Sequence, residues 1–120
     1  MRFFITSTTL FMFAMLGFIQ ATANEEIDVP QRRGDANDSG QVDLNDSMYI
    51  NSYLFNNGPA PSCMDAADAN DDGAVNISDS SCIVNWIFFG EAAPPDPGPS
   101  NCGEDPTADF LTCSSSICRE

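Results

Sequence analysis

Two stretches of this sequence repeat each other and decide its fold: Asp35–Ser47 reads DANDSGQVDLNDS, and Asp68–Ser80 reads DANDDGAVNISDS. The likeness continues downstream, so that Asp35–Pro61 aligns with Asp68–Pro94. In each unit an acidic loop containing Gly precedes an apolar segment, which is followed by Gly and Pro. Internal repetition of this kind indicates a duplicated structural unit. We therefore expect two copies of one loop–helix element.

Each acidic loop has the spacing of a calcium-binding loop. Ca²⁺ takes about 6–8 oxygen ligands, and a loop that curls around the ion offers them from positions 1, 3, 5, 7, 9 and 12. Position 6 is Gly40 or Gly73, and Gly readily adopts the positive φ that the sharp turn needs. Position 7 gives only its backbone carbonyl, so its side chain is unimportant. The predicted ligands are Asp35, Asn37, Ser39, Gln41, Asp43 and Asp46 in the first loop and Asp68, Asn70, Asp72, Ala74, Asn76 and Asp79 in the second.

The two loops differ from the usual EF-hand loop and from each other. Both have Asp at position 12, where Glu is usual. Asp is one methylene shorter, so the loop must close further for bidentate binding; otherwise binding is weaker or the site prefers Mg²⁺. Position 5 is the neutral Ser39 in the first loop and the anionic Asp72 in the second. We therefore predict that the second loop binds Ca²⁺ more tightly.

The apolar segments that follow the loops have helical periodicity, with apolar residues at i, i+3 and i+4. The predicted helices are 46–57 and 79–89, with at most a short helical turn at 64–67 between them. The residues expected to form the core are Ile50, Tyr53, Leu54, Ile83, Trp86 and Ile87.

The ends of these helices have recognisable signals. Asn45 and Ser78 are suitable N-caps. Gly58 and Gly90 suit the left-handed residue that ends a helix.

Other apolar residues have more varied expected roles. Val42 and Val75, at position 8, are expected to pair the two loops in a short β-bridge. Phe55, Phe88 and Phe89 cannot all be buried between two helices, so some of them are expected to form a patch for a partner.

The composition excludes several functions. The 120 residues include 18 Asp and Glu against 4 Arg, no Lys and no His, with a formal net charge of −14. Without His there is no Ser-His-Asp triad, and without Lys there is no Schiff base. So few cations make nucleic acid a poor partner. No catalytic residue can be assigned apart from the loops, so the chain is not expected to be an enzyme. The apolar helical segments argue against a disordered acidic chain.

The N-terminal residues 1–23 are typical of a secretory signal peptide. Arg2 precedes the apolar stretch Phe3–Ile19, and Ala21–Ala23 forms a small-residue cleavage site. An uncleaved membrane anchor is the alternative, but the dense apolar run Leu10–Ile19 is shorter than the ~20 residues that a membrane span needs. We therefore expect the chain to be secreted.

The 5 cysteines of an exported chain are disulfide candidates, and their odd number leaves one thiol without an internal partner. Cys82 lies in a predicted helix and is chosen as that thiol. Cys113 and Cys118 are close enough in sequence to bridge locally. Cys63 and Cys102 would then join the tail to the linker between the repeats.

These features together resemble the dockerin type I family: paired GDANDSG and DANDDG loops, Asp at position 12, an exit helix without an entering helix, and a Gly-Pro linker. The linker 58–63 and the cysteine-containing tail look like a variant found in short exported bacterial chains. The resemblance covers 34–94. It implies a small all-α fold with two antiparallel helices, loops related by pseudo-twofold symmetry, and two bound Ca²⁺ ions.

The resemblance also implies a partner. Dockerins dock onto cohesin modules, often in polysaccharide-degrading assemblies. Residues at positions 10 and 11 select the partner in that family. Here position 10 is bulky and apolar in both repeats, where the best-known dockerins carry small hydroxyl residues, and no catalytic module accompanies the repeats. The corresponding partner-binding residues are Leu44, Asn45, Ile77 and Ser78.

The expected organisation is a signal peptide at 1–23, an N-terminal segment at 24–33, and a dockerin-like domain at 34–94 with repeats at 35–61 and 68–94. A Pro-rich linker and a disulfide-stapled, cysteine-containing extension occupy 95–120.

The leading interpretation is a secreted, non-catalytic, calcium-dependent module that docks to a cohesin-like partner. The alternative is a calcium buffer or a calcium-stabilised structural protein of the EF-hand or thrombospondin-repeat type, without such a partner. Because the clustered carboxylates repel one another without metal, we expect the metal-free chain to be largely unfolded and the calcium form to be folded.

Overall fold

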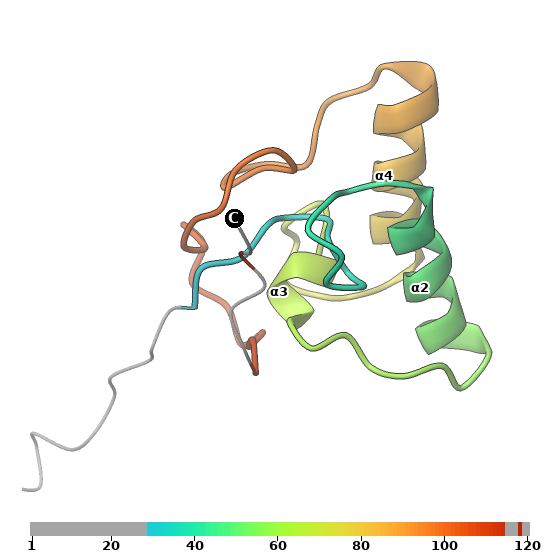
Figure 1. Cartoon of the computed structure of the whole chain (residues 1–120), viewed down its shortest axis with the longest axis horizontal. Coiled ribbons are helices and arrows are strands. Elements are labelled where there is room, and N and C mark those ends of the chain that lie inside the picture. Colours follow the sequence, from blue (N-terminus) through green and yellow to red (C-terminus); the bar gives the residue numbers. More distant parts are fainter. Residues whose placement is uncertain (1–28, 115–117, 119–120) are drawn as a thin grey trace, which may run out of the picture.

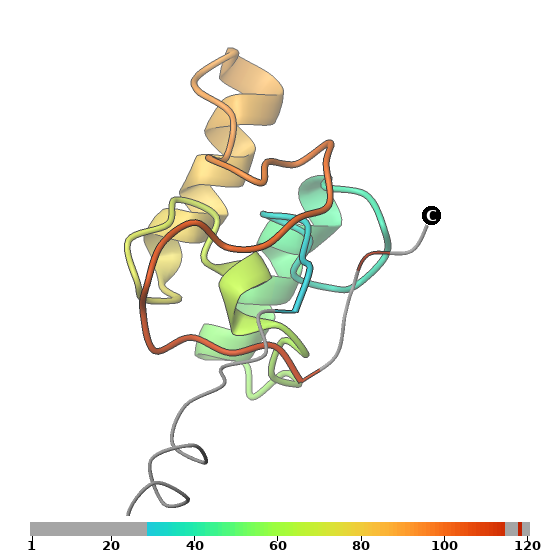
Figure 2. The same ribbon diagram turned by 90° about the vertical axis from the view of Figure 1, so that its left-hand side faces the viewer.

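The computed structural model describes residues 29–114 and residue 118. Its helices in these residues are α2 (Leu44–Phe55), α3 (Met64–Ala67) and α4 (Ile77–Phe89). α2 and α4 pack against each other and run in opposite directions, with the short α3 beside them (Figures 1 and 2). The small all-α fold with antiparallel helices is confirmed, as is the helical turn between the repeats. None of the helices found in the described residues has the length and apolar character to cross a bilayer.

Both long helices begin two residues earlier than predicted. Their N-caps are Asp43 and Asn76, at position 9 of each loop, rather than Asn45 and Ser78 at position 11. The reason is a capping box: the position-12 aspartate is the third helical residue, and its carboxylate accepts a hydrogen bond from the N-cap backbone. The final residue of each loop therefore also stabilises the start of the helix.

The two helices end differently. α4 ends at Gly90, which has the predicted left-handed conformation with φ of 66°. After α2 the left-handed residue is Asn57, with φ of 54°, and the prediction of Gly58 for this role is wrong. Gly58 instead allows a close approach, because its N–H donates to the carbonyl of Ser52 at 2.9 Å and an added Cβ would lie 2.9 Å from the Ser52 backbone carbon.

The core lies between α2, α4 and the two loops. Ile50 and Ile83, at equivalent positions of the two repeats, are fully buried at its centre. Ala36 and Ala69, at position 2 of the loops, are buried against them, together with Ala67 of α3. Small residues at position 2 thus let each loop come close to the helix pair.

The remaining core predictions hold only in part. Leu54 packs against the core while remaining partly exposed, and Tyr53 and Trp86 are also half-buried. Ile87 is exposed, so its predicted core role is wrong. Amphipathic periodicity marks a face of the helix, and with only one partner helix the edge of that face stays in solvent.

The predicted β-bridge between position-8 valines is also wrong. Val42 and Val75 pack against the core instead, and the isolated bridges in the described part of the chain lie elsewhere. One joins Gln31 to Gly103, and the other joins Cys63 to Cys113. Both bridges fasten the C-terminal tail, which crosses back over the N-terminal segment and α3 (Figure 2).

The tail is stapled by disulfides, but with a pairing other than the predicted one. The bonds are Cys63–Cys113 and Cys102–Cys118, and Cys82 is the free thiol, as predicted. The local Cys113–Cys118 bridge and the Cys63–Cys102 bridge are therefore wrong. The tail runs antiparallel beside the start of α3, which brings the second half of the tail, rather than its beginning, to Cys63.

Candidate calcium-binding loops

The position-1 carboxylates point into their loops and are held by backbone N–H groups. Asp35 accepts hydrogen bonds from the N–H groups of positions 5 and 6 at 2.9 and 2.8 Å. Asp68 accepts from the same positions of the second loop at 3.2 and 2.8 Å. Both side chains are buried. Each loop is therefore curled around its first aspartate.

The position-12 carboxylates close the same loops from the helix side. Asp46 accepts from the N–H groups of positions 3 and 9 at 3.1 and 2.8 Å. Asp79 does so at 3.2 and 2.8 Å. Both carboxylates are fully buried. The two repeats thus bring together their first and last predicted ligands with one shared hydrogen-bonding pattern.

The curvature comes from left-handed backbone at positions 4 and 6. Asp38 and Asp71 have φ of 58°, and Gly40 and Gly73 have φ of 88° and 85°. Asp tolerates this region better than most residues, and Gly adopts it without cost. The predicted role of Gly at position 6 is confirmed, whereas the left-handed aspartate at position 4 was not predicted.

The second loop brings three negatively charged candidate metal ligands close together. One carboxylate oxygen from each of Asp68, Asp72 and Asp79 lies within 4.8 Å of the others. Oδ1 of Asn70, at position 3, is buried without a hydrogen-bond partner. Three carboxylates and one free amide oxygen are hard oxygen ligands, which fit Ca²⁺ or Mg²⁺.

The first loop has the same pattern of hydrogen bonds to positions 1 and 12, but its candidate metal ligand at position 5 is the neutral Ser39. The hydroxyl of Ser39 donates to the carbonyl of Gln41 at 3.0 Å, and Oδ1 of Asn37 accepts from the Ser39 N–H at 3.0 Å. In the second loop the Asp72 carboxylate also accepts local bonds, from the Asn70 side chain and from the Ala74 N–H, each at 3.1 Å. The difference between the loops at position 5 is therefore the negative charge of Asp72, which Ser39 lacks.

The remaining predicted ligands lie on the loops with mixed roles. Position 9 is Asp43 or Asn76, and each side chain accepts from the N–H two residues later, at 2.8 and 2.9 Å. These side chains act as helix caps, which agrees with a position that often reaches Ca²⁺ through water. Position 7 is Gln41 in one loop and Ala74 in the other, and neither needs a ligating side chain.

Without a bound cation, the buried carboxylates of the two loops have raised pKa values. Burial raises the pKa of Asp46 and of Asp79 to about 7, despite the hydrogen bonds that lower it. Burial also raises the pKa of Asp35 and Asp68. The ion pairs in the described residues are both made by Arg33 and involve none of these four aspartates. The loops therefore present buried negative charge that a bound cation would neutralise.

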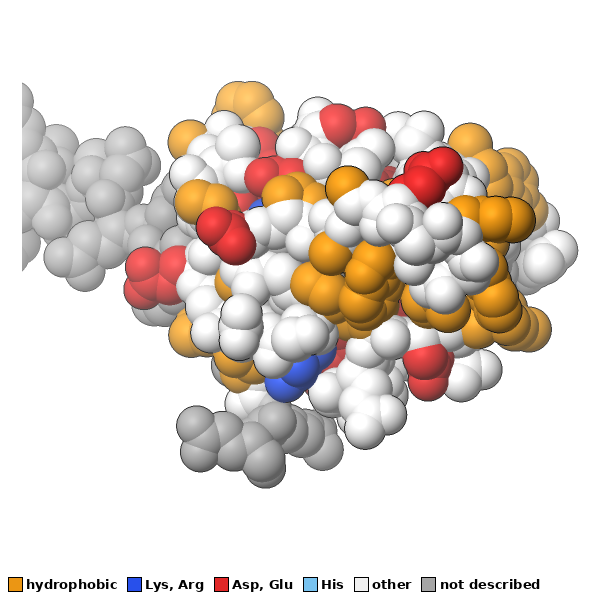
Figure 3. Space-filling model, turned by 90° about the horizontal axis from the view of Figure 1, so that it is seen from above, with side chains coloured by type: hydrophobic (Ala, Val, Ile, Leu, Met, Phe, Trp, Pro, Cys, Tyr) orange, Lys and Arg blue, Asp and Glu red, His pale blue; other side chains and the backbone are white. Residues whose placement is uncertain are grey.

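The predicted partner-binding residues all lie at the surface, at the start of the helices. Leu44 is 42% exposed and Ile77 is 50% exposed, and Asn45 and Ser78 beside them are also exposed. Hydrophobic side chains gather over the α2 and α4 side of the molecule (Figure 3). The other large exposed apolar side chains of these helices are Met48, Phe55, Ile87, Phe88 and Phe89.

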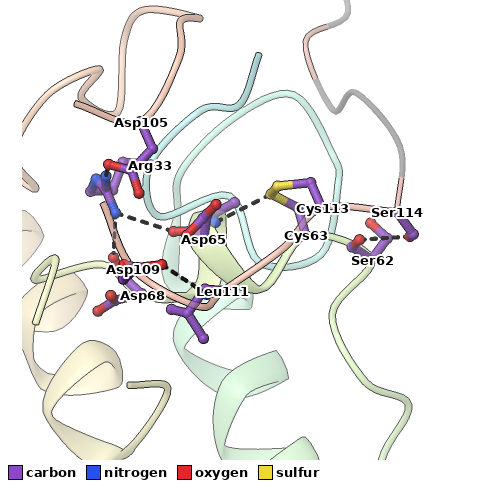
Figure 4. Close-up of a disulfide and its surroundings, with 11 residues drawn as sticks. Arg33, Ser62, Cys63, Asp65, Asp68, Asp105, Asp109, Leu111, Cys113 and Ser114 are labelled. Carbon is purple, nitrogen blue, oxygen red and sulfur yellow. Dashed lines mark hydrogen bonds and ion pairs between the residues drawn. A yellow bond between two sulfur atoms is a disulfide. The ribbon is translucent and has the colours of Figure 1, made fainter. Parts of the chain in front are cut away.

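The sequence did not predict the role of one buried residue, Arg33, which hydrogen-bonds to the second loop and to the tail. Arg33 is fully buried, and its guanidinium donates to the carbonyls of Asp96, Asp65 and Asp68 at 3.1, 3.2 and 3.0 Å. It also donates to the Asp105 carboxylate at 2.7 Å (Figure 4). Arg33 thereby joins the second loop to the tail. A charged residue ahead of a loop gives no sequence signal of burial.

Two oxygen-rich loops each lead into one long helix, α2 or α4, and together they form a duplicated loop–helix module. Residues 33–87 match the family model for the dockerin type I domain, and this segment of the chain is a dockerin type I domain. No catalytic domain is detected beside it. No curated protein and no solved structure matches the chain. Dockerins are calcium-binding, cohesin-docking modules and are typically extracellular.

Proposed function

We propose that this chain is a secreted, non-catalytic docking module that holds one Ca²⁺ in each loop and presents α2 and α4 to a cohesin-like partner. The observation that carries the proposal is the shared frame of the loops. In both, the carboxylates at positions 1 and 12 are buried and fixed by matching backbone N–H groups. Duplicated geometry of this precision favours duplicated metal sites.

The residues proposed to hold the ions are those that the spacing predicts. In the first loop they are Asp35, Asn37, Ser39, the Gln41 carbonyl, Asp43 and Asp46; in the second they are Asp68, Asn70, Asp72, the Ala74 carbonyl, Asn76 and Asp79. A bound Ca²⁺ would supply positive charge and coordination that draw these oxygens together. The chain itself contributes the hydrogen-bonded frame that positions 1 and 12 need.

Metal binding and docking are coupled through the helix starts. The position-12 aspartate both closes the loop and caps its helix, so the ion stabilises the turn that carries positions 10 and 11. Leu44 and Ile77 lie there, and both are exposed. Because these side chains are apolar, we propose a partner surface with apolar pockets at this place rather than one that hydrogen-bonds to hydroxyl groups.

The test is binding of the oxidised, processed chain to a panel of cohesin modules, with calcium and with chelator. We expect binding that chelator abolishes. Leu44→Ser combined with Ile77→Ser should weaken binding at least about tenfold while leaving calcium stoichiometry unchanged. Phe110→Ser removes an exposed apolar side chain from the tail and serves as the matched control. Calcium uptake without any cohesin partner would favour the alternative, a calcium buffer or structural protein.

We further propose that residues 1–23, which lie outside the described residues, direct export. The docking domain is 34–94. The remaining residues, 95–120, form an extension of that domain. A polysaccharide-degrading assembly is the proposed setting. Mass spectrometry of the secreted chain tests the first point, because cleavage after Ala23 gives a mature form beginning at Asn24. Co-purification with carbohydrate-active enzymes through a cohesin-bearing protein tests the setting.

A further inference from the structure

A second acidic cluster lies outside both loops, where the tail crosses α3. It consists of Asp65 from α3 and Asp105 and Asp109 from the tail (Figure 4). One carboxylate oxygen from each residue lies within 4.8 Å of the others. Asp65 is only 8% exposed. The cluster is therefore formed by segments far apart in the sequence, and it exists only when the tail is in place.

Each of these three carboxylates keeps one buried oxygen without a hydrogen-bond partner: Oδ1 of Asp65, Oδ2 of Asp105 and Oδ2 of Asp109. Other oxygens of the cluster are used. Oδ1 of Asp105 accepts from Arg33 at 2.7 Å, and Oδ1 of Asp109 accepts from the Leu111 N–H at 2.8 Å. Buried carboxylate oxygens without partners are costly, so their gathering at one place points to a missing cation.

A cation could reach this cluster from solvent, and the cluster's negative charge is not balanced by nearby arginine. A cavity of about 570 Å³ is lined by all three aspartates, which gives an ion and its water molecules a way in. In the part of the chain that the structure describes, Arg33 forms an ion pair with Asp105 of the cluster, but it is shared with Asp71. Burial, together with Asp109 and Asp105, raises the pKa of Asp65 to about 7. One guanidinium does not balance the carboxylates around it.

We propose that Asp65, Asp105 and Asp109 form a third calcium site, separate from the two loops, which fastens the tail to α3. Three carboxylates are suitable ligands for Ca²⁺, and water from the cavity completes the coordination. With few protein ligands, the expected dissociation constant is on the order of 10⁻⁴–10⁻³ M, as in extracellular calcium modules. The site does not depend on the proposed cohesin docking.

Asp65 is the residue that distinguishes this site from its neighbour. Asp109 also lies within 4.8 Å of Asp68 and Asp71, at the second loop, so a change at Asp109 affects both places. Asp65 belongs only to the cluster with the tail. Asp65→Asn keeps the size of the side chain and removes one charge, which makes it the diagnostic variant.

The experiment is equilibrium dialysis of the oxidised chain against CaCl₂ at about pH 8, where these carboxylates are ionised. We expect three bound ions for the unchanged chain and two for Asp65→Asn. Glu104→Gln, which removes an exposed charge from the same part of the tail, should keep three. Asp35→Ala should lose a loop ion and keep the weak one.

Equal numbers of bound ions in the unchanged chain and in Asp65→Asn would overturn the proposal, whatever number the two loops hold. If Asp65→Asn does not fold, as judged by circular dichroism, Asp65→Ala replaces it, with loss of the weak ion expected again. Cohesin binding by Asp65→Asn is measured in parallel. A variant that loses one ion but still docks supports the third site. Failure of the third-site proposal can therefore be told apart from failure of the docking proposal.

Discussion

The hydroxyl oxygens of Ser47 and Ser80 lie 2.6 Å apart in the buried contact between α2 and α4. The two residues are at the same position of the two repeats, directly after the last residue of each loop. Ile50 and Ile83 meet in the same core one turn further along. The duplicated units therefore use the same residues to contact each other, which is the arrangement expected of a pseudo-twofold pair. Neither repeat can bury its helix face alone.

Replacing one serine of this pair leaves the other as a buried hydroxyl with a poorer partner. Ser80→Ala should lower the free energy of unfolding by about 1–2 kcal/mol. Ser47→Ala should cost less, because the Ser80 hydroxyl also donates to the Ser47 carbonyl at 3.4 Å. The double replacement should cost no more than Ser80→Ala, since no unpaired hydroxyl remains. Urea unfolding at saturating calcium measures all three.

Ser81→Ala is the control for this series. Ser81 is exposed and bonds only within its own helix, to the Ile77 carbonyl, so a change of less than about 0.5 kcal/mol is expected. Strictly additive effects of Ser47→Ala and Ser80→Ala would show that the two hydroxyl groups do not interact.

The second prediction concerns the unequal loops. Exchanging the position-5 residues by Asp72→Ser should weaken calcium binding at the second loop roughly tenfold, and Ser39→Asp should strengthen the first loop by a similar factor. The reason is the number of anionic ligands, which tunes affinity in loops of this kind. Isothermal titration calorimetry on each variant measures the change.

Asp38→Asn provides the comparison, because it removes a charge from the first loop at position 4, which is not a predicted ligand. It should change the affinity less than a change at position 5 does. Tighter binding by the first loop of the unchanged chain would contradict both the ranking and its explanation.

The loops could be predicted in such detail because their information is local. Position 6 must be Gly, positions 1 and 12 must be acidic, and the amphipathic segment follows directly, so the pattern is written in consecutive residues. The helix starts were misplaced because Asn45 and Ser78 are as good caps as Asp43 and Asn76. Only the reach of the position-12 carboxylate back to position 9 decides between them, and that is a three-dimensional relationship.

A third prediction concerns pH in the absence of metal. The pKa of Asp46 and of Asp79 rises from the model-peptide value of 3.8 to about 7 in the folded chain, because burial disfavours the charged form. The folded state therefore holds protons more tightly than the unfolded state. The resulting stability is fully present below about pH 4 and is lost as the pH rises through about 7.

In chelator, the helical circular dichroism signal should consequently increase on acidification from about pH 8 to about pH 5. In calcium the dependence should reverse, since protons then compete with the ion for the same carboxylates. The double variant Asp46→Asn with Asp79→Asn removes two of the carboxylates with a raised pKa and should flatten part of the chelator profile, and Asp65, whose pKa is also raised to about 7, should keep part of it. A metal-free chain that gained helix with rising pH would refute the assignment.

The tail shows where sequence reasoning reached its limit. The cysteines indicated that the tail is stapled, but a local bridge from Cys113 to Cys118 was as consistent with their spacing as the long-range bond to Cys63 that the structure contains. The pairing depends on the path of the tail over α3. That path is fixed by Arg33 and by backbone bonds such as Gln31 to Gly103, none of which leaves a mark in the local sequence.

The fourth prediction follows from this role of Arg33. Arg33→Met should reduce the free energy of unfolding by about 3–5 kcal/mol, because it leaves the buried Asp105 carboxylate without its cation. Arg33→Lys should recover only part of the loss, because one ammonium group cannot donate to the same set of separated acceptors as the guanidinium. Thermal unfolding in calcium, with limited proteolysis of the tail, measures the effect.

Arg32→Met is the matched control: Arg32 is half-buried and donates to the Pro99 carbonyl at 3.2 Å, so about 1 kcal/mol is expected. Equal losses at the two arginines would mean that the buried ion pair does not hold the tail in place.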